Sequence, residues 1–221
     1  MSAASKEYVG HVYLVDDDDS LRESVGAVLK NRQYRVQEFA SATEFLQFHS
    51  PASPAVLLLD MRLPDLSGLQ LQDKLAGPAS NVPVIYMSGQ CRSIEMIDAL
   101  KSGAVDFLLK PFGMDALLDA VAAGLQLHAE RQAKLSKREL LLGQYLLLTE
   151  REREIAELLV QGHANFEIAG ALGISPATVK IHKNRVFAKM QVATAVHLRI
   201  SFEEAGLLGN PGLTAPHGQE S

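Results

Sequence analysis

Hydrophobic residues in the first half of the chain form short runs separated by amphipathic stretches. The runs lie at residues 11–15, 34–36, 55–59, 82–87 and 106–109. Stretches with helical periodicity lie between them, at residues 20–30, 41–48, 68–75 and 94–101. Strands that alternate with helices predict a parallel sheet with helices on both faces. The run at 55–59 is apolar throughout, as expected of a central strand buried on both faces.

One long helical pattern covers residues 114–144, with Gly124 inside it. Its length favours a last helix of the first domain that runs on into an interdomain linker. Two shorter helices joined by a kink are the alternative.

No strand pattern follows residue 148, so the second half is predicted to be all-α. Helices are expected from Thr149 to about Gly162 and at residues 165–172, 176–190 and 194–205. Capping boxes of the form Ser/Thr-x-x-Glu, at Ser20, Ser41 and Thr149, mark helix starts.

Composition and charge narrow the class of protein. A chain of 221 residues with 47% hydrophobic content is long enough for two modest domains with packed cores. The net charge of −5 argues against a generic nucleic-acid binder, but residues 176–191 hold four basic residues and no acid.

The single cysteine, Cys91, excludes an intrachain disulfide. No apolar run approaches the roughly 20 residues of a membrane span, and the polar start is unlike a signal peptide. We therefore expect a cytoplasmic protein with no membrane partner.

Chemically active residues stand where the predicted strands end. They are Asp16 and Asp17, Asp60, Ser88 and Lys110. The carboxyl ends of parallel strands meet at one edge of such a sheet, where ligands bind. Crowded carboxylates favour a divalent cation, and Mg²⁺ suits oxygen ligands and phosphate. An aspartate can accept a phosphoryl group, whose oxygens Lys110, Mg²⁺ and the Ser88 hydroxyl would contact.

An ordered set of motifs covers about residues 12–125. It consists of Val15-Asp16-Asp17, the stretch from Asp60 to Gly68, Ser88-Gly89, the stretch from Gly103 to Phe107, and Lys110-Pro111-Phe112. At these spacings the set resembles the receiver domain of two-component response regulators. The resemblance implies a flavodoxin-like fold, which is a doubly wound α/β domain with a five-stranded parallel sheet. It also implies a cis peptide bond between Lys110 and Pro111.

The same resemblance assigns the phosphoryl and metal sites. Asp60 would be the phosphoryl acceptor. Asp17 and Asp60 would coordinate Mg²⁺ directly, and Asp16 would act mainly through water. The backbone carbonyl of Arg62 would be the third protein ligand.

Three further residues are implied to contact or sense the phosphoryl group. Ser88 and Phe107 resemble the pair that changes conformation on phosphorylation, and Lys110 would contact the phosphoryl oxygens. One departure concerns the loop after Ser88, because the closest subgroup often has His-Gly where this chain has Gln90-Cys91.

A basic helix preceded by a short turn is expected in the second half. The turn Gly173-Ile174-Ser175 precedes Pro176, a favourable first helical residue. Residues 148–192 resemble the LuxR-type helix-turn-helix. The resemblance rests on the stretch from Leu148 to Ile155, on Asn165-x-Glu167-Ile168-Ala169, on Leu172-Gly173-Ile174-Ser175 and on the stretch from Thr178 to His182. With the receiver motifs, it places the chain in the NarL/FixJ family, nearest the FixJ type.

This second resemblance implies double-stranded DNA as the ligand. The implied base contacts are Lys180, Ile181 and Asn184, and the implied phosphate contacts are Thr178, Lys183 and Lys189. Phe166 stands where the family usually has lysine or arginine, so one backbone contact is lost there or the ring packs elsewhere.

The boundaries and partners follow from these assignments. We expect a tail at 1–10, a receiver domain at 11–127, a linker helix at 128–146, an all-α helix-turn-helix domain at 147–208 and a disordered tail at 209–221. A sensor histidine kinase would phosphorylate Asp60. The protein would then regulate transcription at promoter DNA with RNA polymerase, as a homodimer formed on phosphorylation.

Three alternatives stay open. A Mg²⁺-dependent phosphatase or phosphotransferase usually needs a second aspartate two residues after the nucleophile, and Arg62 stands there. A phosphate-independent scaffold would be expected to lack Asp17, Asp60 or Lys110, and all are present. The second domain could also be a helical docking domain with a solvated basic face.

Overall fold

The computed structural model divides the chain into two compact units, Met1–Gln132 and Ala133–Ser221. It describes residues 8–48, 52–75, 81–89, 97, 101 and 103–208. The helix α5 (Met114–Leu146) is one continuous helix of 33 residues that begins in the first unit and ends in the second. The single long helix is therefore confirmed, and the kinked pair of shorter helices is not found.

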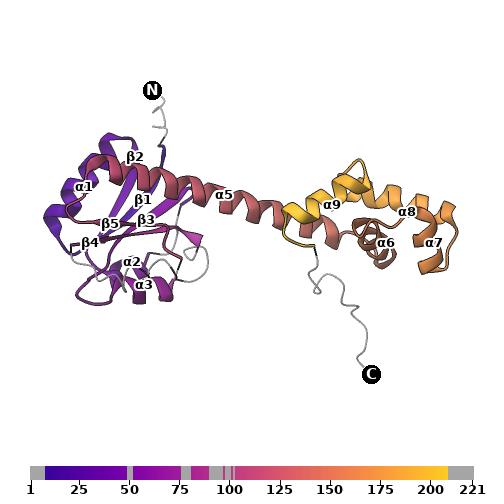
Figure 1. The fold of residues 1–221 in the computed structure, drawn as a ribbon, viewed down its shortest axis with the longest axis horizontal. Coiled ribbons are helices and arrows are strands. Elements are labelled where there is room, and N and C mark those ends of the chain that lie inside the picture. Colours follow the sequence, from indigo (N-terminus) through magenta and orange to yellow (C-terminus); the bar gives the residue numbers. More distant parts are fainter. Residues whose placement is uncertain are drawn as a thin grey trace, which may run out of the picture. The chain divides into compact units, whose positions relative to one another are not determined.

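The first unit is built on a parallel sheet (Figure 1). Its strands are β1 (Gly10–Val15), β2 (Tyr34–Phe39), β3 (Ala55–Asp60), β4 (Val84–Ser88) and β5 (Asp106–Leu109), in the order β2-β1-β3-β4-β5. The helices α1 (Asp19–Asn31), α2 (Ala42–Leu46) and α3 (Gly68–Lys74) connect the first four strands. The doubly wound fold is confirmed. The helix expected at 94–101 lies outside the described residues, apart from Ile97 and Lys101.

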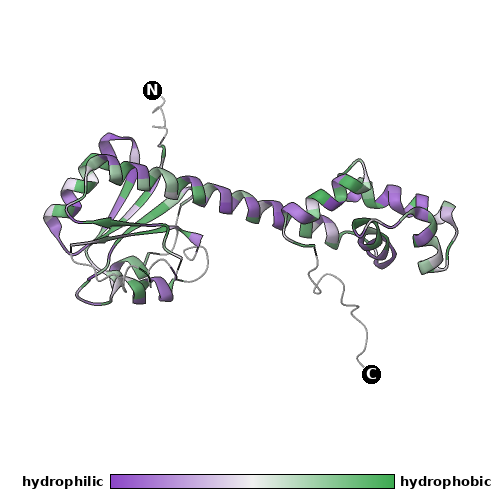
Figure 2. Cartoon of the chain, in the orientation of Figure 1, coloured by the Kyte–Doolittle hydropathy of each residue, from purple (hydrophilic) through white to green (hydrophobic). Residues whose placement is uncertain are grey.

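Two hydrophobic layers enclose the sheet because alternate residues of each strand point to opposite faces. Even-numbered β3 residues such as Val56 and Leu58 pack with α1 and α5, and odd-numbered ones such as Leu57 and Leu59 pack with α2 and α3. Figure 2 shows the strands mainly in the hydrophobic colour. All six residues of β3 are buried, as the apolar run predicted.

The second unit is helical. It contains the end of α5 and four further helices, α6 (Glu150–Val160), α7 (Asn165–Leu172), α8 (Pro176–Lys189) and α9 (Ala195–Glu204). Its core is formed mainly by Leu141, Tyr145, Leu148, Ile155, Leu159, Ile168, Val179, Val186, Met190, Leu198 and Phe202. The α5 residues in this core explain why the linker helix ends inside the second unit.

Helix starts follow the capping rules with one correction. The predicted box at Ser20 is wrong, because α1 begins earlier and the Asp18 carboxylate accepts the N–H of the third helical residue at 3.1 Å. Ser41 caps α2, but the Glu44 carboxylate accepts the N–H of Ala40 in place of that of Ser41. The box at Thr149 is complete.

Over the described residues, no helix is long and apolar enough to cross a membrane.

Alanine at Gly124 tests how closely α5 packs on the sheet. Its Cβ would lie 2.7 Å from Cγ2 of Val56, which is fully buried. We expect Gly124→Ala to lower the free energy of unfolding of the first unit by about 1–3 kcal/mol, although alanine favours the helix.

Gly143, in the same helix, is the matched control because nothing lies within 4 Å of an added Cβ. Gly143→Ala should raise stability by up to about 1 kcal/mol. Urea denaturation, with hydrogen exchange resolving the two units, measures both. Equal effects of the two substitutions would contradict the close packing at Gly124.

Candidate functional site

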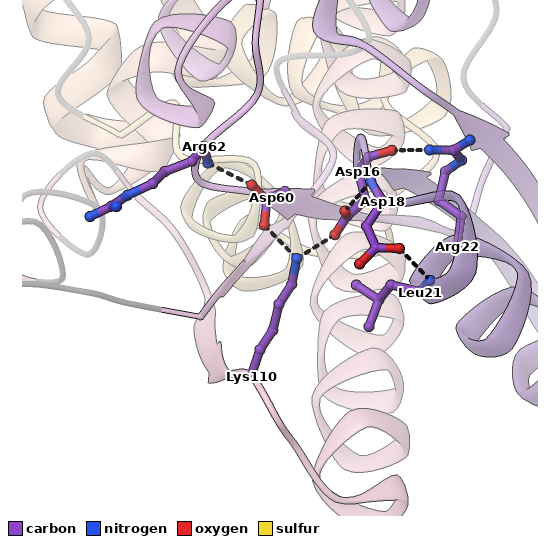
Figure 3. A network of polar contacts seen from close by, with 7 residues as sticks. All are labelled: Asp16, Asp18, Leu21, Arg22, Asp60, Arg62 and Lys110. Atoms are coloured by element: carbon purple, nitrogen blue, oxygen red, sulfur yellow. Dashed lines mark hydrogen bonds and ion pairs between the residues drawn. The ribbon is translucent and has the colours of Figure 1, made fainter.

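Two buried carboxylates meet one lysine at the carboxyl edge of the sheet (Figure 3). Asp16 directly follows β1 and Asp60 ends β3, and these strands are hydrogen-bonded neighbours. Asp16 is 0% exposed and Asp60 is 6% exposed. The Nζ of Lys110, directly after β5, lies 2.6 Å from Oδ2 of Asp16 and 2.6 Å from Oδ1 of Asp60. The structure thus brings together three of the residues that the sequence placed at one edge.

The remaining oxygens of both carboxylates are held by the backbone. The N–H of Arg62 donates to Oδ2 of Asp60 at 2.7 Å. The N–H of Asp18 donates to Oδ1 of Asp16 at 3.0 Å, and the Arg22 guanidinium donates to the backbone carbonyl of Asp16. Both carboxylates are therefore fixed in position, a condition for reproducible chemistry at one oxygen.

The site is short of positive charge. Burial raises the pKa of Asp16, and the negative charge of Asp60 raises it further, while Lys110 acts in the opposite direction. Burial alone would lower the pKa of Lys110, but hydrogen bonds to Asp16 and Asp60 outweigh this and raise it. Two carboxylates share the single ammonium group of Lys110, so a second cation would be favoured beside them.

The donor chemistry of this edge fits Mg²⁺. Asp16 and Asp60 offer the oxygen ligands that this ion prefers. Asp17, however, is exposed, and within the described part of the chain no three His, Cys, Asp or Glu side chains converge on a metal site. Direct coordination by Asp17, Asp60 and the Arg62 carbonyl therefore stays a prediction.

The two switch candidates lie on adjacent strands. Ser88, the last residue of β4, is buried, and its carbonyl accepts the N–H of Lys110 at 2.8 Å. Phe107 of β5 is partly buried, with its ring centroid 6.4 Å from that of Tyr86. The Lys110-Pro111 bond is cis, as the resemblance implied, and Ser53-Pro54, which was not predicted, is cis as well.

One residue that shapes this edge was not predicted from the sequence, Arg22, which holds the chain after β1. Asp18, in the acidic run, caps α1, where its carboxylate satisfies a free N–H. No local pattern indicates that Arg22 folds back onto a carbonyl six residues earlier.

In the second unit, α7 and α8 form the predicted helix-turn-helix. Gly173 ends α7 with a φ of +64°, where glycine is favoured, and Ser175 caps α8 ahead of Pro176. Val179 and Val186 of α8 are buried in the core. The exposed residues of α8 are Pro176, Ala177, Lys180, Ile181, Asn184, Arg185 and Ala188. All three residues expected to face bases are among them.

The three residues expected at phosphates lie in different settings. The Thr178 hydroxyl is 2.9 Å from Oγ of the capping Ser175. Lys183 is partly buried, donates to Oδ1 of Asn165 at 3.1 Å, and lies over the Phe187 ring. Both side chains remain near the exposed face of α8.

Lys189 has a different position. Its Nζ lies 2.6 Å from Oε2 of Glu152 and 3.0 Å from the backbone carbonyl of Leu147. Glu152 is 3% exposed. Burial alone would raise the pKa of Glu152, but hydrogen bonds from Lys189 and Thr149 outweigh it and lower the pKa. Removing Lys189 would leave a buried charge unpaired. Lys189 thus joins α8 to α6 and to the residue that follows α5, and its assignment to a DNA phosphate stays a prediction.

Comparisons with known proteins agree with this geometry. Residues 12–122 match the response regulator receiver domain, and residues 146–201 match bacterial regulatory proteins of the luxR family. The chain is 35% identical over 187 residues to the response regulator protein TmoT of Ectopseudomonas mendocina, covering 85% of each chain. It is 37% identical over 187 residues to the transcriptional regulatory protein FixJ of Azorhizobium caulinodans, covering 85% of this chain and 89% of that one.

Solved structures give the same result. The response regulator StyR matches with a TM-score of 0.76 and 36% identity, covering 88% of this chain and 98% of that one. Full-length FixJ from B. japonicum matches with a TM-score of 0.56 and 30% identity, covering 92% and 100%. The chain therefore belongs to the two-component response regulators in which a receiver domain is followed by a LuxR-type DNA-binding domain, with FixJ-type proteins and TmoT among its relatives.

Proposed function

We propose that Asp60 accepts a phosphoryl group from a sensor histidine kinase, and that this modification controls how the second unit binds promoter DNA. The observation that carries the proposal is the pairing of buried Asp60 and Asp16 with one ammonium group, that of Lys110. A carboxylate held in this way can act as a nucleophile, and the adjacent cation can balance the charge that arrives. Relatives of the chain include transcriptional regulatory proteins, which disfavours the rival phosphatase.

The transfer needs little from the protein besides position and charge. One oxygen of Asp60 attacks the phosphorus of a phosphohistidine, so that a P–O bond forms as the N–P bond breaks and the imidazole nitrogen keeps the electron pair. Lys110 is close enough to follow the phosphoryl oxygens, and the Arg62 N–H holds the second carboxylate oxygen. Asp16 and Asp60, with Asp17 and the Arg62 carbonyl, would hold Mg²⁺, which supplies further positive charge at those oxygens.

The exposed face of α8 is proposed to enter the major groove. Lys180, Ile181 and Asn184 would read base edges, since lysine can pair with guanine and asparagine with adenine. Thr178 and Lys183 would hold phosphates. RNA polymerase would be recruited at the bound promoter.

Dimerisation on phosphorylation is proposed through residues 94–109, a segment that includes Phe107 of the switch pair. Among the described residues of this segment, the large hydrophobic residues Ile97 and Leu109 are exposed, at 49% and 54%. Sedimentation of the full chain with and without beryllofluoride tests the dimer. A dimer with a dissociation constant of tens of micromolar has a binding free energy of roughly −6 to −7 kcal/mol. A monomer of unchanged mass at this concentration would contradict the proposal.

Acetyl phosphate should modify Asp60. We expect the intact mass of the wild-type chain, treated in the presence of Mg²⁺, to gain one phosphoryl group, and that of Asp60→Asn to gain none. Asp73→Asn, which changes an exposed carboxylate of α3, is the matched control and should gain the group as the wild type does. An equal gain in Asp60→Asn would contradict the assignment.

Lys180 and Lys183 should differ in how they affect DNA binding. Positions 180 and 184 share one helix face, and Lys183 is offset from position 180 by about 60°. Lys180→Ala should relax the preferred sequence, because a base contact is worth about 1–3 kcal/mol of discrimination. Lys183→Ala should weaken binding to all sequences and lower the salt slope by about one.

Binding of a selected duplex and a scrambled duplex across a salt series separates these outcomes. A change of sequence preference in Lys183→Ala, with only a salt effect in Lys180→Ala, would mean that α8 is oriented differently in the groove.

A further inference from the structure

Phe166, the second residue of α7, is 81% exposed. Of the large hydrophobic residues that the structure describes as exposed, it has the highest exposed fraction. The ring does not pack against its own domain, so one of the two outcomes considered for this position is not found. A bare aromatic ring at this place needs another explanation.

The surroundings of Phe166 place it beside the proposed DNA-binding face. The preceding residue, Asn165, accepts a hydrogen bond from Nζ of Lys183 at 3.1 Å. The start of α7 therefore lies against α8 at Lys183, next to the exposed Asn184. Consecutive Cα atoms are about 3.8 Å apart, so the Cα atom of Phe166 lies about that far from the Cα atom of Asn165, which accepts the hydrogen bond from Lys183.

The residues beside Phe166 along α7 are polar or small. Asn165, Glu167 and Gly170 offer no continuous apolar patch, and Glu167 turns back to the N–H of Ala164 at 2.7 Å and towards His163. A protein partner would be expected to need a wider apolar surface. DNA offers narrow apolar surfaces, the C–H faces of deoxyribose, between its phosphates.

We infer that Phe166 packs on a deoxyribose of the DNA backbone beside the groove that α8 enters. This inference rests on the proposed DNA-binding function. The contact is independent of sequence, and it carries no charge, so it releases no counterion from DNA. At the edge of the interface, the Phe166 ring would supply a contact that does not depend on salt, in place of the salt-dependent contact of a lysine or arginine.

The test is a salt series with the full chain, using the duplex that the wild type selects and a mixed-sequence duplex of about 30 base pairs, long enough for two half-sites. Phe166→Ala should weaken binding to both duplexes about tenfold with the salt slope unchanged. Phe166→Leu should keep most of the affinity. Phe166→Lys should steepen the slope by about one, because a phosphate lies beside each sugar.

Two controls separate this contact from other effects. Leu146→Ala removes another exposed side chain (69% exposed) outside the helix-turn-helix and should bind as the wild type does. Phe166→Ala leaves no cavity and favours the helix, so its thermal unfolding should match the wild type.

Two results would overturn the inference: wild-type affinity in Phe166→Ala, or an unchanged salt slope in Phe166→Lys. If Lys180→Ala weakens binding and Phe166→Ala does not, only this inference fails. If the wild type itself shows no selective binding of DNA, the proposed function fails as well as the inference about Phe166.

Discussion

The structure of the first unit depends on one constraint, the need of two buried carboxylates for positive charge. Parallel pairing of β1 with β3 brings Asp16 and Asp60 to one edge, where their negative charges repel. Lys110 reaches both at 2.6 Å, and the cis bond to Pro111 follows directly. Two carboxylates that share one ammonium group leave one negative charge unbalanced. This remaining negative charge is consistent with the proposed binding of Mg²⁺ at the edge.

A second buried charge organises the other unit. Glu152 satisfies the capping box of α6 and also binds Lys189 at the end of α8. Lys189 donates further to the carbonyl of Leu147, one residue after α5 ends. One ion pair thus fixes α8 relative to the end of the linker helix within this unit.

The sequence predicted the sheet and the edge well, since both follow from strand pattern and parallel topology. The all-apolar β3 was found as a central strand, while β2 continues to Phe39, beyond its predicted end, through the polar Gln37 and Glu38. The pairing of Glu152 with Lys189 was missed because 37 residues separate them and no local period links them. The exposure of Phe166 likewise depended on tertiary packing, so the sequence alone left its two outcomes open.

Occupancy of the Asp60 site should change the DNA affinity of the second unit. Fluorescence anisotropy of a selected duplex, titrated with the full chain with and without beryllofluoride and Mg²⁺, measures this coupling directly. We expect tighter binding by about 5–150-fold, the usual range for coupled sites, and no response in Asp60→Asn. Equal affinity in both states of the wild type, or an equal gain in Asp60→Asn, would contradict the claim.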